Sequence, residues 1–223
     1  MCGLQGNRSA RGRQVDWFFD VISPFAYLQL ENMDSLPGDL QVMVTPVLLG
    51  GMLTHWQAKG PAEIPEKRKQ TYRMAQWRAR RMGIEFRMPP AHPFNPLPAL
   101  RLATALRIDL DGARRLMRHI WRDGQEVGTE AGFDGLCAVL GLSAETGRLM
   151  INRPQVKERL RRNTETACAR GLFGVPTFIV DAQQFWGEDA TDMLADYLAD
   201  PAMFTRDDYP RIDDLPIGLQ RLG

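Results

Sequence analysis

The chain has 223 residues, 44% of them hydrophobic and 25% charged, so it can bury the core of one domain and still carry a large insertion. Its 28 basic and 27 acidic residues give a formal net charge of +1, which argues against nucleic acid as the main partner. No apolar run approaches the roughly 20 residues needed to span a bilayer. The three cysteines include no C-x-x-C pair, which excludes a dithiol redox centre and a disulfide framework.

The first 14 residues contain three arginines but no apolar stretch, so residues 1–14 are interpreted as a disordered leader and not as a secretory signal. Without paired cysteines, the cytoplasm is the expected compartment. Cys137 and Cys168 lie in apolar helical patterns that favour small buried hydrophobes, while Cys2 is expected to be exposed. The three histidines lack the spacing of a metal site, so no metal is expected.

An apolar run that ends at Asp20 predicts a buried first strand. Ser23 then has the chemistry of a helix N-cap. Pro24 suits the first helical position, because the N–H that proline lacks would have no helical partner there. A thiolate at such a helix start is stabilised by free backbone N–H groups and the helix dipole. Thioredoxin-like enzymes place a nucleophilic cysteine here, so with only a hydroxyl from Ser23 the thiolate is expected to arrive on a small molecule. A plain helix cap is the alternative interpretation.

The middle of the chain predicts one more strand and then a long helical block. Residues 40–49 alternate and are rich in Val and Leu, which predicts a second strand. If it lies parallel to the first, the helix between them forms a right-handed crossover. Helical patterns then cover residues 63–82, 95–108, 111–123, 130–140, 144–152 and 154–170. A helical block between two β-containing halves indicates an insertion into a sheet domain.

The chain returns to strand patterns near its C-terminal end. Pro176 precedes the apolar run 177–180, where proline is tolerated only at a strand start or edge. In thioredoxin-like folds this proline is cis and faces the start of the first helix. The turn Asp181-Ala182 leads to 183–186, a hairpin partner. Residues 189–198 predict the final helix.

Five segments in order carry a resemblance to a known family: 23–28, 46–51, 60–65, 93–97 and 185–189. From about residue 15 to 200 the chain resembles the 2-hydroxychromene-2-carboxylate isomerase family, close kin of kappa-class glutathione transferases and DsbA-type oxidoreductases. The resemblance implies an α/β fold in which a thioredoxin-like domain is interrupted by an all-helical insertion. The expected boundaries are 15–55 with 171–200 for that domain, 56–170 for the insertion and 201–223 for a C-terminal tail of unassigned role.

The resemblance also implies that glutathione is the cofactor. The expected glutathione-binding residues are Ser23, Val175, Trp186, Gly187, Glu188 and Asp189. Ser23 would donate a hydrogen bond that favours thiolate over thiol, since a serine nucleophile needs a nearby base and no G-x-S-x-G motif is present. Val175 would pair with the cysteinyl unit through its backbone. Asp189 would pair with the γ-glutamyl ammonium. The backbone N–H groups at the helix start of 187–189 would attract a carboxylate of the ligand. The alternative is that Asp189 is a plain N-cap.

The helical block is expected to supply the pocket for the electrophile. Its candidate substrate residues are His55, Trp56, Lys67 and Asn95. Lys67 matches a family lysine and could meet a carboxylate, although a surface lysine is equally consistent with the pattern. Trp56 could stack on an aromatic substrate, with a core or interface tryptophan as the alternative. The chain departs from many relatives at 57–60, which lacks their Gly-Asn, and at Ala190, where they carry Arg.

The implied activity is a glutathione-dependent cis-trans isomerisation of an unsaturated carboxylate, of which 2-hydroxychromene-2-carboxylate is one example. Thiolate addition turns a rigid double bond into a rotatable single bond, and elimination restores it in the other geometry. The alternatives are a kappa-type transferase and a non-catalytic glutathione- or peptide-binding module. A disulfide oxidoreductase is not expected, because no second cysteine lies near Ser23. The expected partners are a small-molecule substrate and a second copy of the chain, without nucleic acid or membrane.

Overall fold

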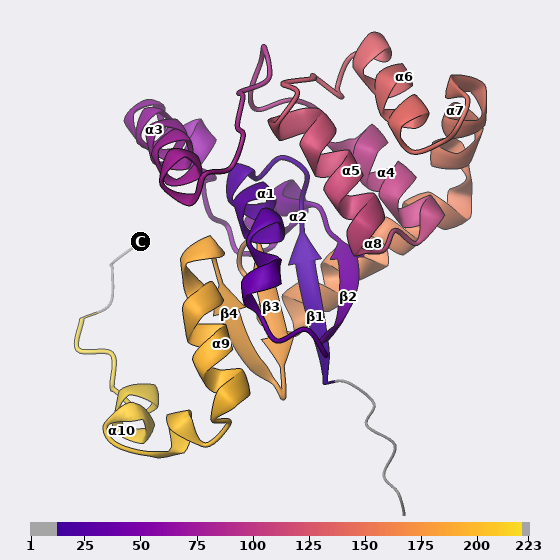
Figure 1. Cartoon of the computed structure of the whole chain (residues 1–223). Coiled ribbons are helices and arrows are strands. Elements are labelled where there is room, and N and C mark those ends of the chain that lie inside the picture. The colour runs from indigo at the N-terminus through magenta and orange to yellow at the C-terminus, as the bar shows by residue number, and fades with distance from the viewer. Residues whose placement is uncertain (1–12, 220–223) are drawn as a thin grey trace, which may run out of the picture.

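The computed structural model describes residues 13–219 and centres on one four-stranded sheet (Figure 1). The strands are β1 (Gln14–Phe19), β2 (Gln41–Pro46), β3 (Thr177–Val180) and β4 (Gln183–Trp186), in the order β2-β1-β3-β4. β1 and β2 are parallel, and β3 is antiparallel to both β1 and β4. The β3–β4 hairpin is confirmed, and its turn residues Asp181 and Ala182 have φ of 49° and 69°, the backbone of a type I′ turn.

All the predicted helices of the middle region are present. The helices of the chain are α1 (Pro24–Glu31), α2 (Leu49–His55), α3 (Pro65–Met82), α4 (Leu97–Leu106), α5 (Leu110–Trp121), α6 (Glu130–Val139), α7 (Ala144–Asn152), α8 (Pro154–Ala169), α9 (Thr191–Ala199) and α10 (Tyr209–Asp213). Short 3₁₀ turns occupy Met33–Ser35, Pro61–Glu63, Glu188–Ala190 and Met203–Thr205. α3 begins later than predicted because Pro65 disfavours helical backbone at Ile64, whose ψ is 114°.

Several boundaries differ from the sequence-based expectation. The second strand was predicted to reach residue 49 but ends at Pro46, and α2 follows it. β1 begins at Gln14, inside the predicted leader, whereas residues 1–12 and Cys2 among them lie outside the described part. The predicted final helix is divided into a 3₁₀ turn and α9, and the tail contains the short α10. Phe204 packs its ring on Tyr197, which attaches the tail to α9.

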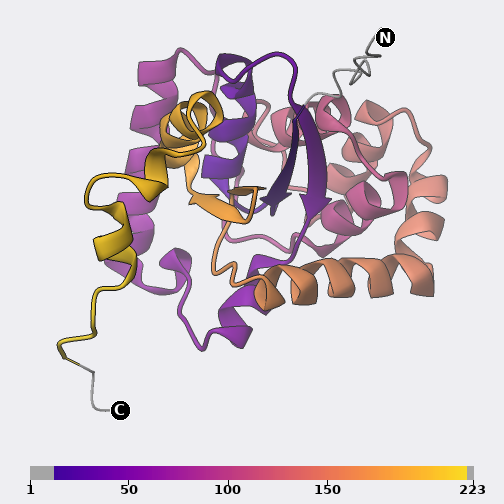
Figure 2. The ribbon, with the colours of Figure 1, turned by 90° about the horizontal axis from the view of Figure 1, so that it is seen from below.

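The helices form layers on both faces of the sheet. Figure 2 shows α8 along one face and α1 with α9 on the other, while α4 to α7 gather beyond the β2 edge in Figure 1. Within residues 13–219, no helix is both long enough and apolar enough to cross a bilayer. In the same range no group of three or more His, Cys, Asp or Glu side chains is placed to hold a metal ion.

The hydrophobic core runs from the sheet into the helical block without a break. Trp17 and Phe19 of β1 are fully buried and stack at 4.7 Å between ring centroids. The same cluster contains Leu116 and Trp121 of α5 and Phe133 of α6. Cys137 and Cys168 are buried thiols, as expected. Because burial of apolar surface is the main favourable term in folding, the sheet and the helical block stabilise each other.

Candidate active site at the start of the first helix

Ser23 forms the N-cap of α1, and Pro24 is its first residue, as the sequence predicts. The Ser23 Oγ accepts a hydrogen bond from the Ala26 backbone N–H at 3.3 Å. A hydroxyl that accepts in this way keeps its own proton available for donation. Ser23 is only 7% exposed, so a bond that it donates is shielded from bulk water.

The side chain of Asp20, which is fully buried, supports the turn that leads into Ser23 through hydrogen bonds. Its Oδ1 accepts from the Ile22 N–H at 3.0 Å, and its Oδ2 accepts from the Leu49 N–H at 2.8 Å. Burial raises the pKa of the Asp20 carboxyl to about 7, and the bonds from backbone N–H groups oppose this rise. Asp20 therefore joins the Ser23 turn to the first residue of α2.

Two side chains from the helical block hold the carbonyl groups of the same turn. Trp121 of α5 donates its Nε1–H to the Val21 oxygen at 3.0 Å. The Nε2 of His92, in the loop before α4, lies 2.8 Å from the Ile22 oxygen. A carbonyl can only accept, so this His92 nitrogen carries a proton. The backbone ahead of Ser23 is thus fixed by donors far away in the sequence.

His92 is itself held by Tyr72 of α3. The Tyr72 hydroxyl lies 2.7 Å from His92 Nδ1 and 2.9 Å from the His92 carbonyl oxygen. Burial lowers the pKa of His92 and raises that of Tyr72, so both side chains are neutral near pH 7. In the neutral ring Nδ1 is an acceptor, and the Tyr72 hydroxyl can satisfy it.

The cis Val175–Pro176 bond lies at the same end of the sheet as Ser23. Phe18 of β1 pairs with Thr177 of β3, which places Pro176 beside the end of β1. The Pro176 oxygen accepts from the Gly187 N–H at 2.9 Å. Within residues 13–219, the N–H and C=O of Val175 make no hydrogen bond, so they remain open to an extended ligand.

The segment 187–189 is tied to α1 as well. Gln29 of α1 donates its amide N–H to the Gly187 oxygen at 2.8 Å. Gly187 has a φ of 95°, and a Cβ there would overlap Asp189 Oδ1, so the position requires glycine. Gly187 is therefore held between Pro176 at the start of β3 and Gln29 of α1.

Glu188 and Asp189 point to different surroundings. Glu188 is buried and forms an ion pair with Arg78 of α3, with 2.5 Å between Nε and Oε2 but without the alignment of a hydrogen bond. Burial raises the pKa of its carboxyl, and Arg78 opposes this rise. Asp189 is exposed and caps no helix, because Gly187 caps the 3₁₀ turn and Ala190 caps α9. Both carboxylates line a polar cleft of about 560 Å³ between α3 and α9.

Exposed aromatic rings lie on or against the segments that flank the Val175–Pro176 bond in the fold. Trp186 is 53% exposed and meets Phe173 edge to face at 4.9 Å between centroids. Trp56 donates its Nε1–H to the Leu172 oxygen at 2.8 Å and remains 45% exposed, so it is not a core residue. These rings form an apolar border beside the candidate site, in which Phe173 had not been predicted.

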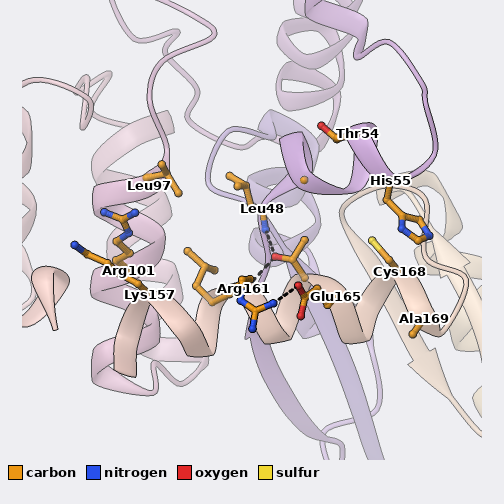
Figure 3. Close-up of a pocket in the computed structure, with 13 residues that line it drawn as sticks. Leu48, Thr54, His55, Leu97, Arg101, Lys157, Arg161, Glu165, Cys168 and Ala169 are labelled. Carbon is orange, nitrogen blue, oxygen red and sulfur yellow. Dashed lines mark hydrogen bonds and ion pairs between the residues drawn. The ribbon is translucent and has the colours of Figure 1, made fainter. Parts of the chain in front are cut away.

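The four candidate substrate residues do not meet in one pocket. His55 lies beside Trp56 at the end of α2 and lines a cavity of about 690 Å³ between α2, α4 and α8, shown in Figure 3. Lys67 is exposed in the first turn of α3. Asn95 accepts from the Leu97 N–H at 3.1 Å, which is a local role at the start of α4.

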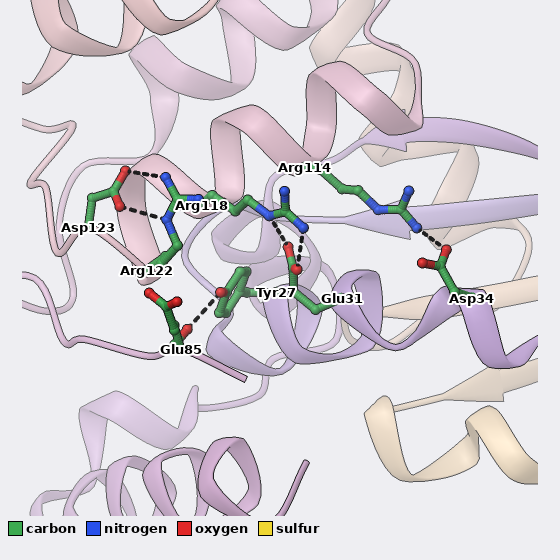
Figure 4. Close-up of polar contacts among 8 residues, drawn as sticks. All are labelled: Tyr27, Glu31, Asp34, Glu85, Arg114, Arg118, Arg122 and Asp123. Atoms are coloured by element: carbon green, nitrogen blue, oxygen red, sulfur yellow. Dashed lines mark hydrogen bonds and ion pairs between the residues drawn. The ribbon is translucent and has the colours of Figure 1, made fainter. Parts of the chain in front are cut away.

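Polar contacts fasten α1 to α5 on the other side of the site (Figure 4). The Arg118 guanidinium donates two hydrogen bonds to the Glu31 carboxylate, at 2.8 and 2.7 Å. The Tyr27 hydroxyl donates a hydrogen bond to the backbone carbonyl oxygen of Glu85 at 2.7 Å. Because two parallel bonds fix geometry as well as distance, α1 is oriented by α5.

Sequence reasoning missed several side chains that shape this site. Asp20 was interpreted only as the end of a strand, although its acidic group after an apolar run was visible. His92 stands directly before a proline in a motif that was otherwise used. Trp121 and Tyr72 gave no local signal, because Val21, the partner of Trp121, lies 100 residues away and His92, the partner of Tyr72, lies 20 residues away.

Comparisons with known proteins agree with this architecture. The chain is 28% identical over 207 residues to glutathione S-transferase kappa 2 of Caenorhabditis elegans, covering 84% of this chain and 92% of the relative. It is 24% identical over 194 residues to 2-hydroxychromene-2-carboxylate isomerase of Sphingobium xenophagum, covering 84% and 99%. A solved structure of a 2-hydroxychromene-2-carboxylate isomerase matches with a TM-score of 0.75 at 20% identity, covering 86% of this chain and 97% of that one.

The match to the isomerase structure establishes the fold: a thioredoxin-like domain with a helical insertion between its second and third strands. A model of the DsbA-like thioredoxin domain matches residues 14–199, which is most of the chain. The chain therefore belongs to the DsbA-like thioredoxin domain family.

Proposed function

We propose that this protein is a glutathione-dependent isomerase of a small unsaturated carboxylate. The observation that carries the proposal is the Ser23 hydroxyl, which caps α1 and donates no hydrogen bond among residues 13–219, at the same end of the sheet as the cis Val175–Pro176 bond. The relatives that match over most of the chain are kappa-class glutathione transferases and an isomerase. Together they support enzymatic chemistry on a small molecule with glutathione as the thiol.

The residues of the chain fit glutathione at three points. The Ser23 hydroxyl would donate to the sulfur, and the start of α1 would add backbone N–H groups and the positive end of a dipole. The unpaired N–H and C=O of Val175 would align the cysteinyl unit. Asp189, exposed at the polar cleft, would meet the γ-glutamyl ammonium, while Trp186 and Gly187 border that path.

Bound glutathione would supply a thiolate that adds to an unsaturated carbon and leaves after rotation about the former double bond. Ser23 would lower the pKa of that thiol by stabilising its charged form. Asp20, Trp121 and His92 would keep the Ser23 turn in one geometry. The border of Trp56, Phe173 and Trp186 would shield the sulfur from water.

The first experiment compares wild type with Ser23→Ala on cis-enoyl and chromene carboxylates. Loss of a charge-assisted hydrogen bond worth roughly 1.5–3 kcal/mol corresponds to a thiol pKa higher by about one to two units. The rate should fall about 10- to 100-fold near neutral pH and recover as pH rises. Ser143→Ala is a matched control, because Ser143 caps α7 through the same bond at 3.1 Å. Full activity without glutathione would overturn the proposal.

A kappa-type transferase is the second candidate, since kappa-class relatives are 28% and 26% identical to this chain. A transferase consumes one glutathione for each product, whereas an isomerase returns it. Thiol titration during steady turnover therefore separates the two. A non-catalytic binding module would bind glutathione and leave every substrate unchanged.

We also propose that the protein forms a homodimer. We propose the cytoplasm as its compartment, because Cys137 and Cys168 are unpaired thiols among the described residues. The surface offered to the second copy would include α3, which leaves Met74 and Trp77 exposed. The division into 15–55 with 171–200 and 56–170 also stays a proposal. The continuous core between them predicts one cooperative unfolding transition.

A further inference from the structure

The cavity between α2, α4 and α8 is separate from the candidate active site (Figure 3). Its volume is about 690 Å³, which is within the range of small-molecule sites. No residue of the Ser23 turn, of 175–176 or of 186–189 lines it. A ligand here would therefore leave the Ser23 hydroxyl accessible.

The inner wall of this cavity is mainly apolar. The apolar side chains that line it are Leu48, Leu97, Leu160, Cys168 and Ala169. Arg101 of α4 lines the same space, and its Nε is buried without a hydrogen-bond partner in the part of the chain that the structure describes. An unsatisfied buried donor is costly, and this cost is removed when an acceptor binds beside it.

The charges around the cavity are unevenly paired. Arg161 is shared by Glu158 and Glu165 on its own helix, so its charge is largely compensated. Arg101 and Lys157 have no carboxylate within ion-pair distance among residues 13–219. Both cationic side chains line the cavity, and Figure 3 shows them toward the same end of it in that view. The cavity thus joins an apolar wall to an uncompensated positive end.

We propose that this cavity binds a small amphipathic carboxylate, with its apolar body against the leucines and its carboxylate on Arg101 and Lys157. A neutral ligand would leave the positive charges of Arg101 and Lys157 uncompensated even if it accepted from the Arg101 Nε, and a small inorganic anion would leave the apolar wall in contact with water. The apolar wall and the positively charged end together favour a molecule that has both an apolar body and a carboxylate. The inference does not rest on glutathione chemistry.

The histidines allow each site to be observed separately. The sequence has three, of which His55 lines the cavity, His92 contacts the Ser23 turn and His119 lies on α5. Titration with 1-naphthoate should shift the NMR signal of the His55 ring and leave those of His92 and His119 in place. Glutathione should instead shift His92, so the two proposals fail independently.

Variants test the role of charge. Arg101→Met should weaken 1-naphthoate binding about 10- to 100-fold, as expected for loss of a charge-assisted bond, and Lys157→Met should weaken it in the same direction. Arg162→Met is the matched control, because Arg162 is on α8 but outside the cavity. Inorganic phosphate and neutral 1-naphthamide should bind more weakly than 1-naphthoate.

Any of three outcomes would overturn the proposal: no binding at millimolar 1-naphthoate, equal binding of the amide, or a shift confined to His92. Equal binding of phosphate would also contradict it, since the apolar wall would then contribute nothing. If Arg101→Met fails to fold, Lys157→Met and the amide comparison still decide the question.

Discussion

Two helices of the same insertion, α5 and α3, contribute to the Ser23 turn in different ways. α5 buries seven of its 12 residues, whereas α3 buries only Ala75 and Ala79 of its 18. Figure 1 shows α5 within the group of helices next to the sheet and α3 apart from that group. α5 therefore supports the site as part of the core, while α3 reaches it through the polar tips of Tyr72 and Arg78.

The difference follows from their sequences. The apolar side chains of α5 recur at helical spacing and form one wide stripe, so the helix gains stability by covering the core. α3 is charged on most sides, and two alanines provide its close packing. Because α3 buries little apolar surface, its displacement costs little free energy. Its exposed side is therefore suited to bind a ligand or a second copy of the chain.

The largest expected effect is on the α5 side. Trp121→Ala should lower the free energy of unfolding by about 3–5 kcal/mol, because it opens a cavity and leaves the Val21 oxygen unbonded. Trp77→Ala on α3 should change it by less than about 0.5 kcal/mol, since Trp77 is 53% exposed. Denaturant unfolding of both variants measures the contrast. Equal losses would refute the division between a core helix and a peripheral one.

The buried carboxyl of Asp20, which accepts from the Ser23 turn and from α2, should give the next largest effect. The Asp20 carboxyl has a pKa of about 7 in the folded protein against 3.8 ordinarily. Between these values the folded state holds a proton that the unfolded state releases, so stability falls as pH rises, by up to about 4 kcal/mol. Asp20→Asn should remove this slope.

The slope, and not the absolute stability, is the quantity to measure for Asp20→Asn. The amide cannot accept from both backbone N–H groups, so the variant loses stability at every pH. Buried His92 and His119, whose pKa values are lowered, destabilise the fold as pH falls, in wild type and variant alike. An unchanged difference between the two proteins on both sides of the window would show that Asp20 does not titrate there.

A smaller effect is expected at the contact between α3 and the turn. Tyr72→Phe removes the hydroxyl that lies between His92 Nδ1 and the His92 oxygen, at a cost of about 1 kcal/mol. The ¹⁵N shift of Nδ1 should change, while the Nε2 bond to the Ile22 oxygen persists. Tyr209→Phe in the exposed α10 serves as control. If the Nε2 signal changes instead, α3 does more to position the turn than its shallow packing indicates.

The smallest expected effect on the stability of the monomer comes from substitutions on the exposed side of α3, which test whether this helix forms the dimer interface. Trp77→Ala and Met74→Ser should leave unfolding nearly unchanged but weaken self-association, if the dimer covers this helix. Light scattering over a range of protein concentrations measures it. A wild-type protein that stays monomeric would reject the dimer, and a dimer insensitive to both variants would place the interface elsewhere.

Local chemistry in the sequence determined much of this protein. The Ser23 cap, the proline after it, the hairpin turn at Asp181-Ala182 and the helices of the middle region all depend on contacts within a few residues. Such contacts are encoded by residue type and spacing, so a pattern suffices to predict them. The family resemblance added the connection between Ser23 and the cis proline, which no local pattern contains.

Only the tertiary structure decided how the site is held. α2 follows the second strand because the Leu49 N–H meets Asp20 and the Leu48 N–H meets the Thr164 hydroxyl, 116 residues away. The convergence of Trp121 and His92 on one turn, and of Arg101 and Lys157 on one cavity, likewise joins distant segments. Hydrogen bonds and charges act over a few ångströms in space, whereas the order of residues records only separation along the chain, so these partners become visible only when the core brings their helices together.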